Sequence, residues 1–369
     1  MRHQASVIVA LAALAPPAAG QITARIGDQA VCARCRIDIV KVADLQSGGG
    51  APTIDRKPYS MAMDSRGRVL LVVDGADQAL LYDRDGTYLK TIGHRGNGPG
   101  EFIAARYVSF GRGDTAYIFD NRSRRASIFS PAMAFVRSAP MPRMFSAATL
   151  NDGAMVVSGG IADPSRVGMS FHLFDRMGNQ RGSYGFPDAS VVPGESGLNV
   201  NWVTASRTGG YWSVSYNGAY TLAQWGPNGD LVQRLERESK LVGPGIGANV
   251  GFTRDRPTDP YIRSFAEDRE GRIWIEIVVA DKDWKRGARF NPNLPGERGM
   301  VPEIDNYDLV YDTVIEVIDP RSRSLLVSQR FDAVYSPIVA PDRIARPIVQ
   351  PDGTFRVALY SMHLAGQKD

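Results

Sequence analysis

The segment IGHRGNGPGEF (92–102) is the stretch whose composition most suggests chemistry, because four glycines lie beside a histidine and an arginine. A glycine-rich loop exposes backbone N–H groups that can bind a phosphate, and His94 and Arg95 would add side-chain donors for such an anion. The alternative is a tight corner of the chain, since glycine and proline favour abrupt bends. A dinucleotide-binding loop would follow a parallel strand and lead into a helix, so the flanking elements distinguish the two interpretations.

The two cysteines lie in VCARCRID, where two residues separate Cys32 from Cys35. Such a pair can be a redox couple, half of a metal site or a haem attachment point. Arg36 follows in place of a histidine, which excludes haem attachment, and a zinc site would need about four ligands from a chain with 4 histidines. A thioredoxin-like pair would open a helix, whereas this one precedes a strand pattern. The motif therefore predicts a local disulfide or two unreactive thiols.

Basic side chains gather in two segments. DNRSRR (120–125) places three arginines close together, which indicates an anionic partner, although each alone is most simply a solvated charge. In the segment 280–308, Trp284 lies among lysines and arginines that could form a cationic, aromatic lip for an anionic or sugar-like ligand. Alternatively, Trp284 packs under its own loop while the charges face water. The candidate ligand-binding residues are His94, Arg95, Arg122, Arg124, Trp284, Lys285 and Arg286.

The elements that must position these residues are short strands joined by tight turns, and helical periodicity is scarce. YSMAMDSRGRVLLVVD (59–74) and ALLYDRDGTYLKTIG (79–93) each give two strands around a turn that ends in glycine. This four-stranded unit recurs along the chain, and a sixth copy begins but ends early. The further copies span 107–141, 146–186, 202–236, 262–331 and, incompletely, 342–361.

The missing outer strand has a donor in CRIDIVKVADL (35–45), a lone strand pattern that precedes the first copy. Pairing it with the incomplete last copy closes a ring and removes exposed sheet edges. We therefore predict an all-β, six-bladed propeller of four-stranded antiparallel blades in one domain, residues 21–369. A two-sheet sandwich would not explain the repeating pairs of turns. In this arrangement the segment 92–102 joins one blade to the next, so a corner is the favoured interpretation.

Two segments resemble a known family. IGHRGNGPGEF looks like the interblade segment of NHL-repeat and related bacterial six-bladed propellers. AYIFDNRSRRASIF (116–129) is similar to that family's crossing from second to third strand, with Asp120, Arg125 and Phe129 at the family's positions. The match covers residues 58–130 and is only architectural beyond. The N-terminal closing strand also resembles TolB-like propellers, and such families include binding platforms and lyases, so the resemblance implies the fold and leaves the function open.

The repeat divides the connections between two faces, which we name here. Turns after the first and third strands form the turn face, and they are short. Connections after the second and fourth strands form the loop face. The long connections are 94–104, 159–169, 187–201, 237–261 and the largest, an insertion at 280–311. Because binding sites concentrate on long loops held by a rigid scaffold, we place the site on the loop face, over the central channel.

Catalysis at that channel is the alternative, since propeller lactonases and lyases hold a metal there with oxygen ligands from several blades. The available oxygen donors are Glu101, Asn199, Asn201, Asn217 and Asp255. No spacing singles them out, His94 and His172 are too few for a histidine-based site, and no Gly-x-Ser-x-Gly motif appears. We assign no metal ligand and no cofactor from the sequence, although a calcium ion in the channel would be compatible with it.

The N-terminus and the overall composition bound the remaining questions. Residues 1–20 have the layout of a signal peptide: Arg2, an apolar run over 6–14, and small residues before Gln21. The run is too short for a bilayer of about 30 Å, so we expect an exported, periplasmic or extracellular protein without a membrane span. A net charge of +4 without a dense basic block argues against nucleic acid. We expect a monomeric platform that binds a protein or a small anionic or carbohydrate ligand, with a metal-dependent lactonase or lyase as the alternative.

Overall fold

A computed structural model describes residues 22–73, 75–159, 169–185, 201–215, 219–243, 252–253, 255–289 and 303–366. Within these ranges the chain forms β-strands and three short 3-10 helices: η1 (Arg112–Asp114), η3 (Trp284–Arg286) and η5 (Tyr307–Leu309). None of the described helices is long and apolar enough to cross a membrane. The predicted signal peptide, residues 1–20, lies outside the described residues.

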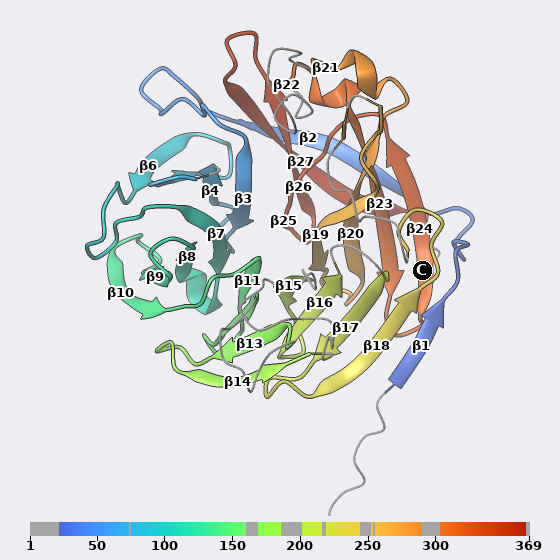
Figure 1. Ribbon diagram of the computed structural model, residues 1–369, viewed down its shortest axis with the longest axis horizontal. Helices are drawn as coiled ribbons and strands as arrows, with labels where there is room; N and C mark the ends of the chain where they lie inside the picture. The colour runs from blue at the N-terminus through green and yellow to red at the C-terminus, as the bar shows by residue number, and fades with distance from the viewer. Residues whose placement is uncertain are drawn as a thin grey trace, which may run out of the picture.

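Six four-stranded antiparallel sheets surround a central axis, so the predicted propeller is confirmed (Figure 1). Blade 1 has β3 (Pro58–Met63), β4 (Val69–Val73), β5 (Ala79–Tyr82) and β6 (Tyr88–Ile92). Blade 2 has β7 (Ala105–Phe110), β8 (Ala116–Asp120), β9 (Arg125–Phe129) and β10 (Phe135–Pro140). Blade 3 has β11 (Ser146–Thr149), β12 (Met155–Ser158), β13 (Phe171–Phe174) and β14 (Gln180–Tyr184). Blade 4 has β15 (Asn201–Ala205), β16 (Tyr211–Ser215), β17 (Thr221–Trp225) and β18 (Leu231–Arg237).

The last two blades contain the insertion and the ring closure. Blade 5 has β19 (Tyr261–Glu267), β20 (Ile273–Ala280), β23 (Tyr311–Asp319) and β24 (Ser324–Phe331), and the insertion between β20 and β23 holds a small hairpin of β21 (Ala288–Arg289) and β22 (Glu303–Ile304). Blade 6 has β25 (Ile338–Ala340), β26 (Arg343–Val349), β27 (Phe355–Ala365) and β2 (Arg36–Leu45). β2 pairs antiparallel with β27, so the N-terminal strand closes the ring as predicted.

The core lies between blades rather than within one layer. Each blade packs its apolar side chains against the next, and six hydrophobic clusters join the six neighbouring pairs. The second strands are therefore buried on both faces and have nearly continuous apolar sequences, such as VLLVV in β4 and IWIEIVVA in β20. The innermost strands β3, β7, β11, β15, β19 and β25 contact one another around the channel.

Two features differ from the predicted arrangement. β1 (Ile22–Ile26) pairs parallel with β18 and adds a fifth strand to blade 4, which the sequence did not indicate. In blade 6, residues 342–361 form the second and third strands, because β25 already supplies the first with three residues and a two-residue turn. The glycine turn at Gly353 therefore joins strands two and three and belongs to the loop face.

Cys32 and Cys35 are joined by a disulfide with an S–S distance of 2.03 Å. The bridge lies directly before β2, so it constrains the chain where the closing strand begins.

Candidate functional site

The turn between β8 and β9 presents arginines on the loop face. Asp120 is fully buried, and its carboxylate accepts the backbone N–H groups of Arg122 and Ser123 at 2.8 and 2.9 Å. The same carboxylate accepts the N–H groups of Ile103 and Ala104 at 2.7 and 3.1 Å. Burial alone would raise the pKa of Asp120, but these four hydrogen bonds hold it below its ordinary value. The Asp120 carboxylate thus accepts hydrogen bonds from the backbone and, within the part of the chain that the structure describes, forms no ion pair with the arginines of its own turn.

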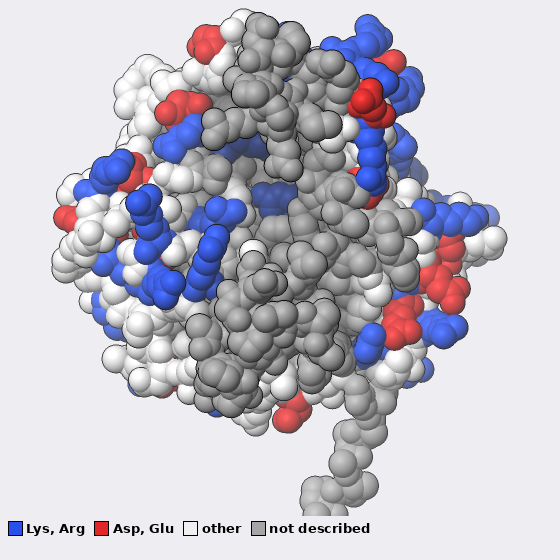
Figure 2. All heavy atoms as spheres, viewed as in Figure 1, with Lys and Arg blue, Asp and Glu red and all other residues white. Residues whose placement is uncertain are grey.

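These arginines line a cavity of about 410 Å³, which we call the arginine pocket. Its lining residues are Ala104, Arg106, Asn121, Arg122, Arg124, Arg143, Met144 and Phe145. Arg122, Arg124 and Arg143 are exposed and have no acidic partner among the residues that the structure describes. Arg124 also takes a left-handed backbone conformation, with φ of 51°, which is uncommon for a residue with a side chain. Figure 2 shows lysine and arginine side chains gathered over the blade of β7–β10 and beside the hollow in the middle of this face.

The channel beside the pocket is narrow and receives residues from every blade. Its described cavity measures about 100 Å³. One lining residue from each inner strand illustrates its character: Tyr59, Tyr107, Ser146, Trp202, Arg263 and Ile338. The described lining is therefore aromatic, cationic and hydroxylic rather than acidic.

β-Bulges position three of the side chains near the channel. The pairing register skips Tyr59 in β3, Arg106 in β7 and Arg263 in β19, each near the start of an inner strand. A bulge leaves one extra residue outside the ladder and re-aims its side chain. The guanidinium of Arg106 lies 4.2 Å from the Tyr59 ring centre, and that of Arg263 lies 5.6 Å from it. Arg263 is also 5.2 Å from the Trp202 ring, so cation–π contacts hold this cluster together.

A lysine and a buried glutamate flank Arg263. Burial, and then the charge of Arg263, lower the pKa of Lys57 to about 8, while Glu276 acts against the shift. The Lys57 ammonium lies 4.4 Å above the ring of Tyr307, at the base of the insertion. Glu276 is fully buried opposite Ser264, and burial raises its pKa while Arg263 acts against that rise. Arg106 and Arg263 therefore join the arginine pocket and the channel into one cationic region on the loop face.

The glycine-rich segment 92–102 forms a corner whose backbone groups are hydrogen-bonded within the segment and to Arg125 of blade 2. The N–H of Gly98 donates to Glu101 Oε2 at 2.7 Å, and that of Gly96 donates to the Phe102 carbonyl at 3.0 Å. Arg125 of blade 2 donates to the carbonyls of Asn97, Gly98 and Glu101, at 2.7, 2.9 and 2.5 Å. These donors and acceptors are occupied, so the segment offers no phosphate cradle there. His94 and Arg95 are exposed on this corner, and His94 Nε2 lies 3.4 Å from Glu101 Oε1.

Trp284 adopts the packed arrangement that the sequence had left as an alternative. It is 8% exposed, and its ring makes an edge contact with Phe252 at 5.7 Å in a small cluster under the insertion. Lys285 and Arg286 are exposed on η3: the Lys285 ammonium lies 5.3 Å from the Trp284 ring centre, and Arg286 lies 3.5 Å from Asp283. Trp284 therefore supports its loop and does not present a free aromatic face.

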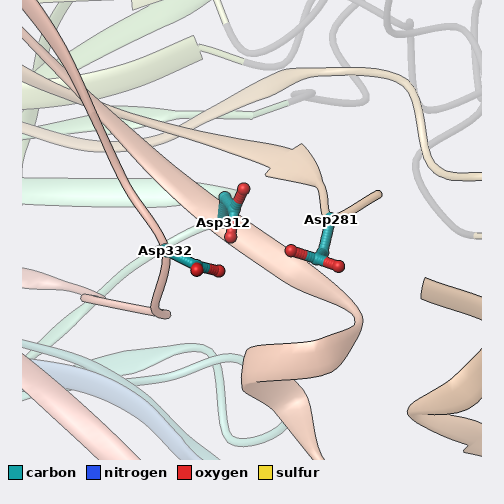
Figure 3. Close-up of side chains that lie close together, drawn as sticks. All are labelled: Asp281, Asp312 and Asp332. Atoms are coloured by element: carbon teal, nitrogen blue, oxygen red, sulfur yellow. The ribbon is translucent and has the colours of Figure 1, made fainter. Parts of the chain in front are cut away.

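The remaining candidates that the structure describes do not converge in the channel. Asp255 is exposed, Asn201 is half-buried at the start of β15, and Asn199 and Asn217 lie outside the described residues. His172 is buried, with its ring nitrogens 2.9 Å from Ser183 Oγ and 2.9 Å from the Gly159 carbonyl. Among the described residues, one acidic group has a spacing that suits a metal ion: Asp281, Asp312 and Asp332 (Figure 3). It lies at the root of the insertion and lines neither the described channel cavity nor the arginine pocket.

The turn face has a larger cavity of about 830 Å³ over blade 6 and the turns of blades 1 and 5. It exists because the β25–β26 turn is short while β27 and β2 extend beyond it. Most of its arginines face acids: Arg272 lies 2.6 Å from Asp268, and Arg343 lies 2.7 Å from Asp342. Its charge is therefore largely balanced, unlike that of the arginine pocket.

Comparisons with known proteins place the fold and not the activity. No family model matches the chain, and no curated protein sequence matches it. An exported protein of Bacteroides fragilis, described as a putative one, has a similar structure with a TM-score of 0.58 and 11% identity, over 94% of this chain and 99% of that one. A DUF4221 family member from Bacteroides vulgatus also aligns with a TM-score of 0.58 and 11% identity, over 89% and 99% of the two chains. Virginiamycin B lyase from Staphylococcus aureus aligns less well, with a TM-score of 0.47 and 8% identity over 89% and 99%. The propeller fold is shared with the two Bacteroides proteins, and the finer resemblance to NHL-repeat or TolB-like propellers stays a prediction.

Proposed function

We propose that this protein is an exported binding protein whose loop face takes an anionic ligand at the arginine pocket, next to the mouth of the channel. The observation that carries the proposal is that Arg122, Arg124 and Arg143 are exposed around one cavity without a described acidic partner. Guanidinium groups match the geometry of carboxylate, sulfate and phosphate groups, so a cluster of them around one cavity without a described acidic partner favours an anionic ligand.

Export to the periplasm or the cell exterior is part of this proposal. It rests on the signal-like sequence of residues 1–20 and on the disulfide, which is stable in an oxidising compartment. The similar protein from Bacteroides fragilis carries a matching description.

The volume of the site limits the ligand. The described channel cavity of about 100 Å³ holds little more than a few waters, whereas the pocket of about 410 Å³ accepts a small anion or an acidic sugar. A charged terminus or side chain of a partner protein would fit the same chemistry. The predicted set His94, Arg95, Lys285 and Arg286 stays a proposal for the rim of this surface.

The test uses two turns with matched sequences. Sulfate and a small sulfated sugar are titrated into the protein by calorimetry at low salt. We expect the double variant Arg122→Gln/Arg124→Gln to bind them at least about tenfold more weakly, because two guanidinium groups leave the pocket. The matched control is Arg321→Gln/Arg323→Gln, which removes the same charge from the similar turn DPRSRS (319–324) on the turn face. Equal losses in the two variants would show that net charge alone attracts the anion, and the proposal would be wrong.

A metal-dependent lactonase or lyase acting in the channel remains the second candidate. The described channel lining favours it less, because arginine, tyrosine and tryptophan side chains stand where that chemistry needs carboxylate, amide or imidazole ligands.

A further inference from the structure

Three aspartates converge at the root of the insertion in blade 5. Asp281 directly follows β20, Asp312 lies at the start of β23, and Asp332 directly follows β24. One carboxylate oxygen from each lies within 4.8 Å of the others. Figure 3 shows Asp312 between the other two, with carboxylates approaching from three separate segments. The insertion leaves and re-enters the blade between the first two of these residues.

The charge of this group is not balanced. Asp281 and Asp312 are 5% and 4% exposed, so two of the three carboxylates are withdrawn from water. Among the described residues, Arg330 is the cation that contacts this group, through Asp312: its Nε lies 2.7 Å from Asp312 Oδ2, and its Nη2 donates to the Ala280 carbonyl at 2.9 Å. Three carboxylates against one guanidinium leave a net charge of about −2 in a mostly buried place, which is costly without a further cation.

A separate observation concerns one atom of Asp312. Its Oδ2 is bonded to Arg330, but its Oδ1 is buried and has no hydrogen-bond partner among the described residues. Buried carboxylate oxygens are almost always satisfied, and an orphaned one marks a missing ion or water. Burial and the charges of Asp281 and Asp332 also raise the pKa of Asp312, although Arg330 opposes this.

We propose that Asp281, Asp312 and Asp332 bind a divalent cation, with calcium as the best match. The donors are all oxygens, which selects a hard cation over zinc or copper. They come from three segments in an irregular arrangement, which suits the flexible coordination of calcium better than the strict octahedron of magnesium. Water and nearby backbone carbonyls would complete the coordination sphere.

The cation would fix both ends of the insertion to blade 5. The end of the insertion, just before β23, is already attached to blade 6 and to the chain before it. Asp308 lies 2.7 Å from Arg346 and accepts the N–H of Val334 at 3.0 Å. Tyr307 beside it lies under Lys57 at the channel mouth. Calcium at the root would therefore stabilise the segment that borders the proposed ligand site, although the cation site itself does not depend on that proposal.

The test is calcium binding by the whole protein after treatment with EDTA. Calorimetry with calcium chloride is expected to give one site per chain, with weaker binding of magnesium and an increase of several degrees in Tm. Asp332→Asn removes an exposed ligand without disturbing the core and is expected to weaken calcium binding by about tenfold or more. The matched control is Asp283→Asn, which removes a neighbouring charge that pairs with Arg286 outside the group, and it should change the affinity far less.

Asp312→Asn separates a cation site from a simple ion pair with Arg330. If the group binds calcium, this variant abolishes the calcium-dependent rise in Tm while the calcium-free protein melts no lower than the parent, because repulsion is relieved. If Asp312 serves only Arg330, the calcium-free variant melts at a lower temperature and calcium has no effect on the parent. That result, or equal calcium affinity in Asp332→Asn and the parent, would overturn the proposal.

Discussion

Two turns of this propeller have almost the same sequence and opposite surroundings. DNRSRR (120–125) joins β8 to β9 on the loop face, and DPRSRS (319–324) joins β23 to β24 on the turn face. In both, the aspartate accepts the N–H two residues later, at 2.8 and 2.9 Å. In both, the second arginine has a positive φ, 51° and 53°. The backbone conformation is therefore a property of the local sequence.

The difference lies in what else each aspartate binds. Asp120 is fully buried and accepts two further N–H groups from the segment that precedes β7. Its carboxylate therefore links its own turn to that segment. Asp319 is partly exposed, and Arg321 Nε lies 3.4 Å from its Oδ1. Arg321 is thus paired within its own turn, whereas Arg122 faces a cavity without a described acidic partner. The comparison teaches that tertiary contacts of the aspartate decide whether the arginines serve the turn or a ligand.

The largest expected effect comes from replacing Asp120, the buried one of the two aspartates that begin these turns. Asp120→Asn replaces an acceptor of four backbone N–H groups and should lower the free energy of unfolding by about 3 kcal/mol. Asp319→Asn, the matched control, keeps an amide oxygen that can accept the Arg321 N–H, loses only a surface ion pair and should cost about 1 kcal/mol or less. Urea unfolding of both variants measures the difference.

The same variant has a signature in acid. Because the pKa of Asp120 is below its ordinary value in the folded state, its stabilisation is present above the unfolded-state pKa of about 3.9 and is lost as the pH falls through the folded-state value. Asp120→Asn should therefore flatten the acid limb of the stability curve. An acid limb as steep as that of the parent would assign the stabilisation to other carboxylates.

A smaller effect is expected at the channel side of the cationic region. With a pKa near 8, Lys57 loses its charge as the pH rises through that value, so the affinity for sulfate, whose charge is constant there, should fall by about fivefold. Lys57→Met should bind sulfate weakly and without this pH step. Lys90→Met is the control, since Lys90 donates to the Ala132 carbonyl at 3.1 Å in a turn of the opposite face. A step that persists in Lys57→Met would assign the titration to another group.

The sequence predicted the fold because the fold depends on local signals. Apolar second strands such as β4 and polar turns such as 64–68 recur along the chain, and the unpaired strand pattern at 35–45 pairs with the last blade, the one blade whose copy in the sequence is incomplete. β1 carried no such signal: five residues that pair parallel with β18 have neither a turn nor a repeat to mark them. Their position depends on contacts such as the hydrogen bond of Arg237 to the Gly27 carbonyl at 2.9 Å, which joins residues far apart in sequence.

The site was predictable only in part, for the same reason. Arg122 and Arg124 stand out in DNRSRR, but Arg143 lies in an unremarkable connection, and Arg106 and Arg263 reach the channel through bulges that no sequence pattern announced. For Trp284 the sequence suggested more than the structure shows. A large aromatic residue among charges suggested a binding surface, but Trp284 is buried and its ring packs against Phe252. Charge can be read from sequence, but the absence of a partner for that charge is a property of the folded surroundings.

A graft between the two turns tests this conclusion, and the smallest effect is expected here. Pro320→Asn with Ser324→Arg converts the turn-face sequence into DNRSRR, and the background is Arg122→Gln/Arg124→Gln so that any recovered binding must come from the graft. We expect sulfate affinity to stay at the background level and stability to change by less than about 1 kcal/mol. Asp319 would still hold Arg321, and Ala104, Met144 and Phe145, which line the arginine pocket, lie on the loop face and not at this turn. Recovery of binding to the level of the parent would mean that the six-residue sequence suffices, and the surroundings of Asp120 would then not be the cause of the difference.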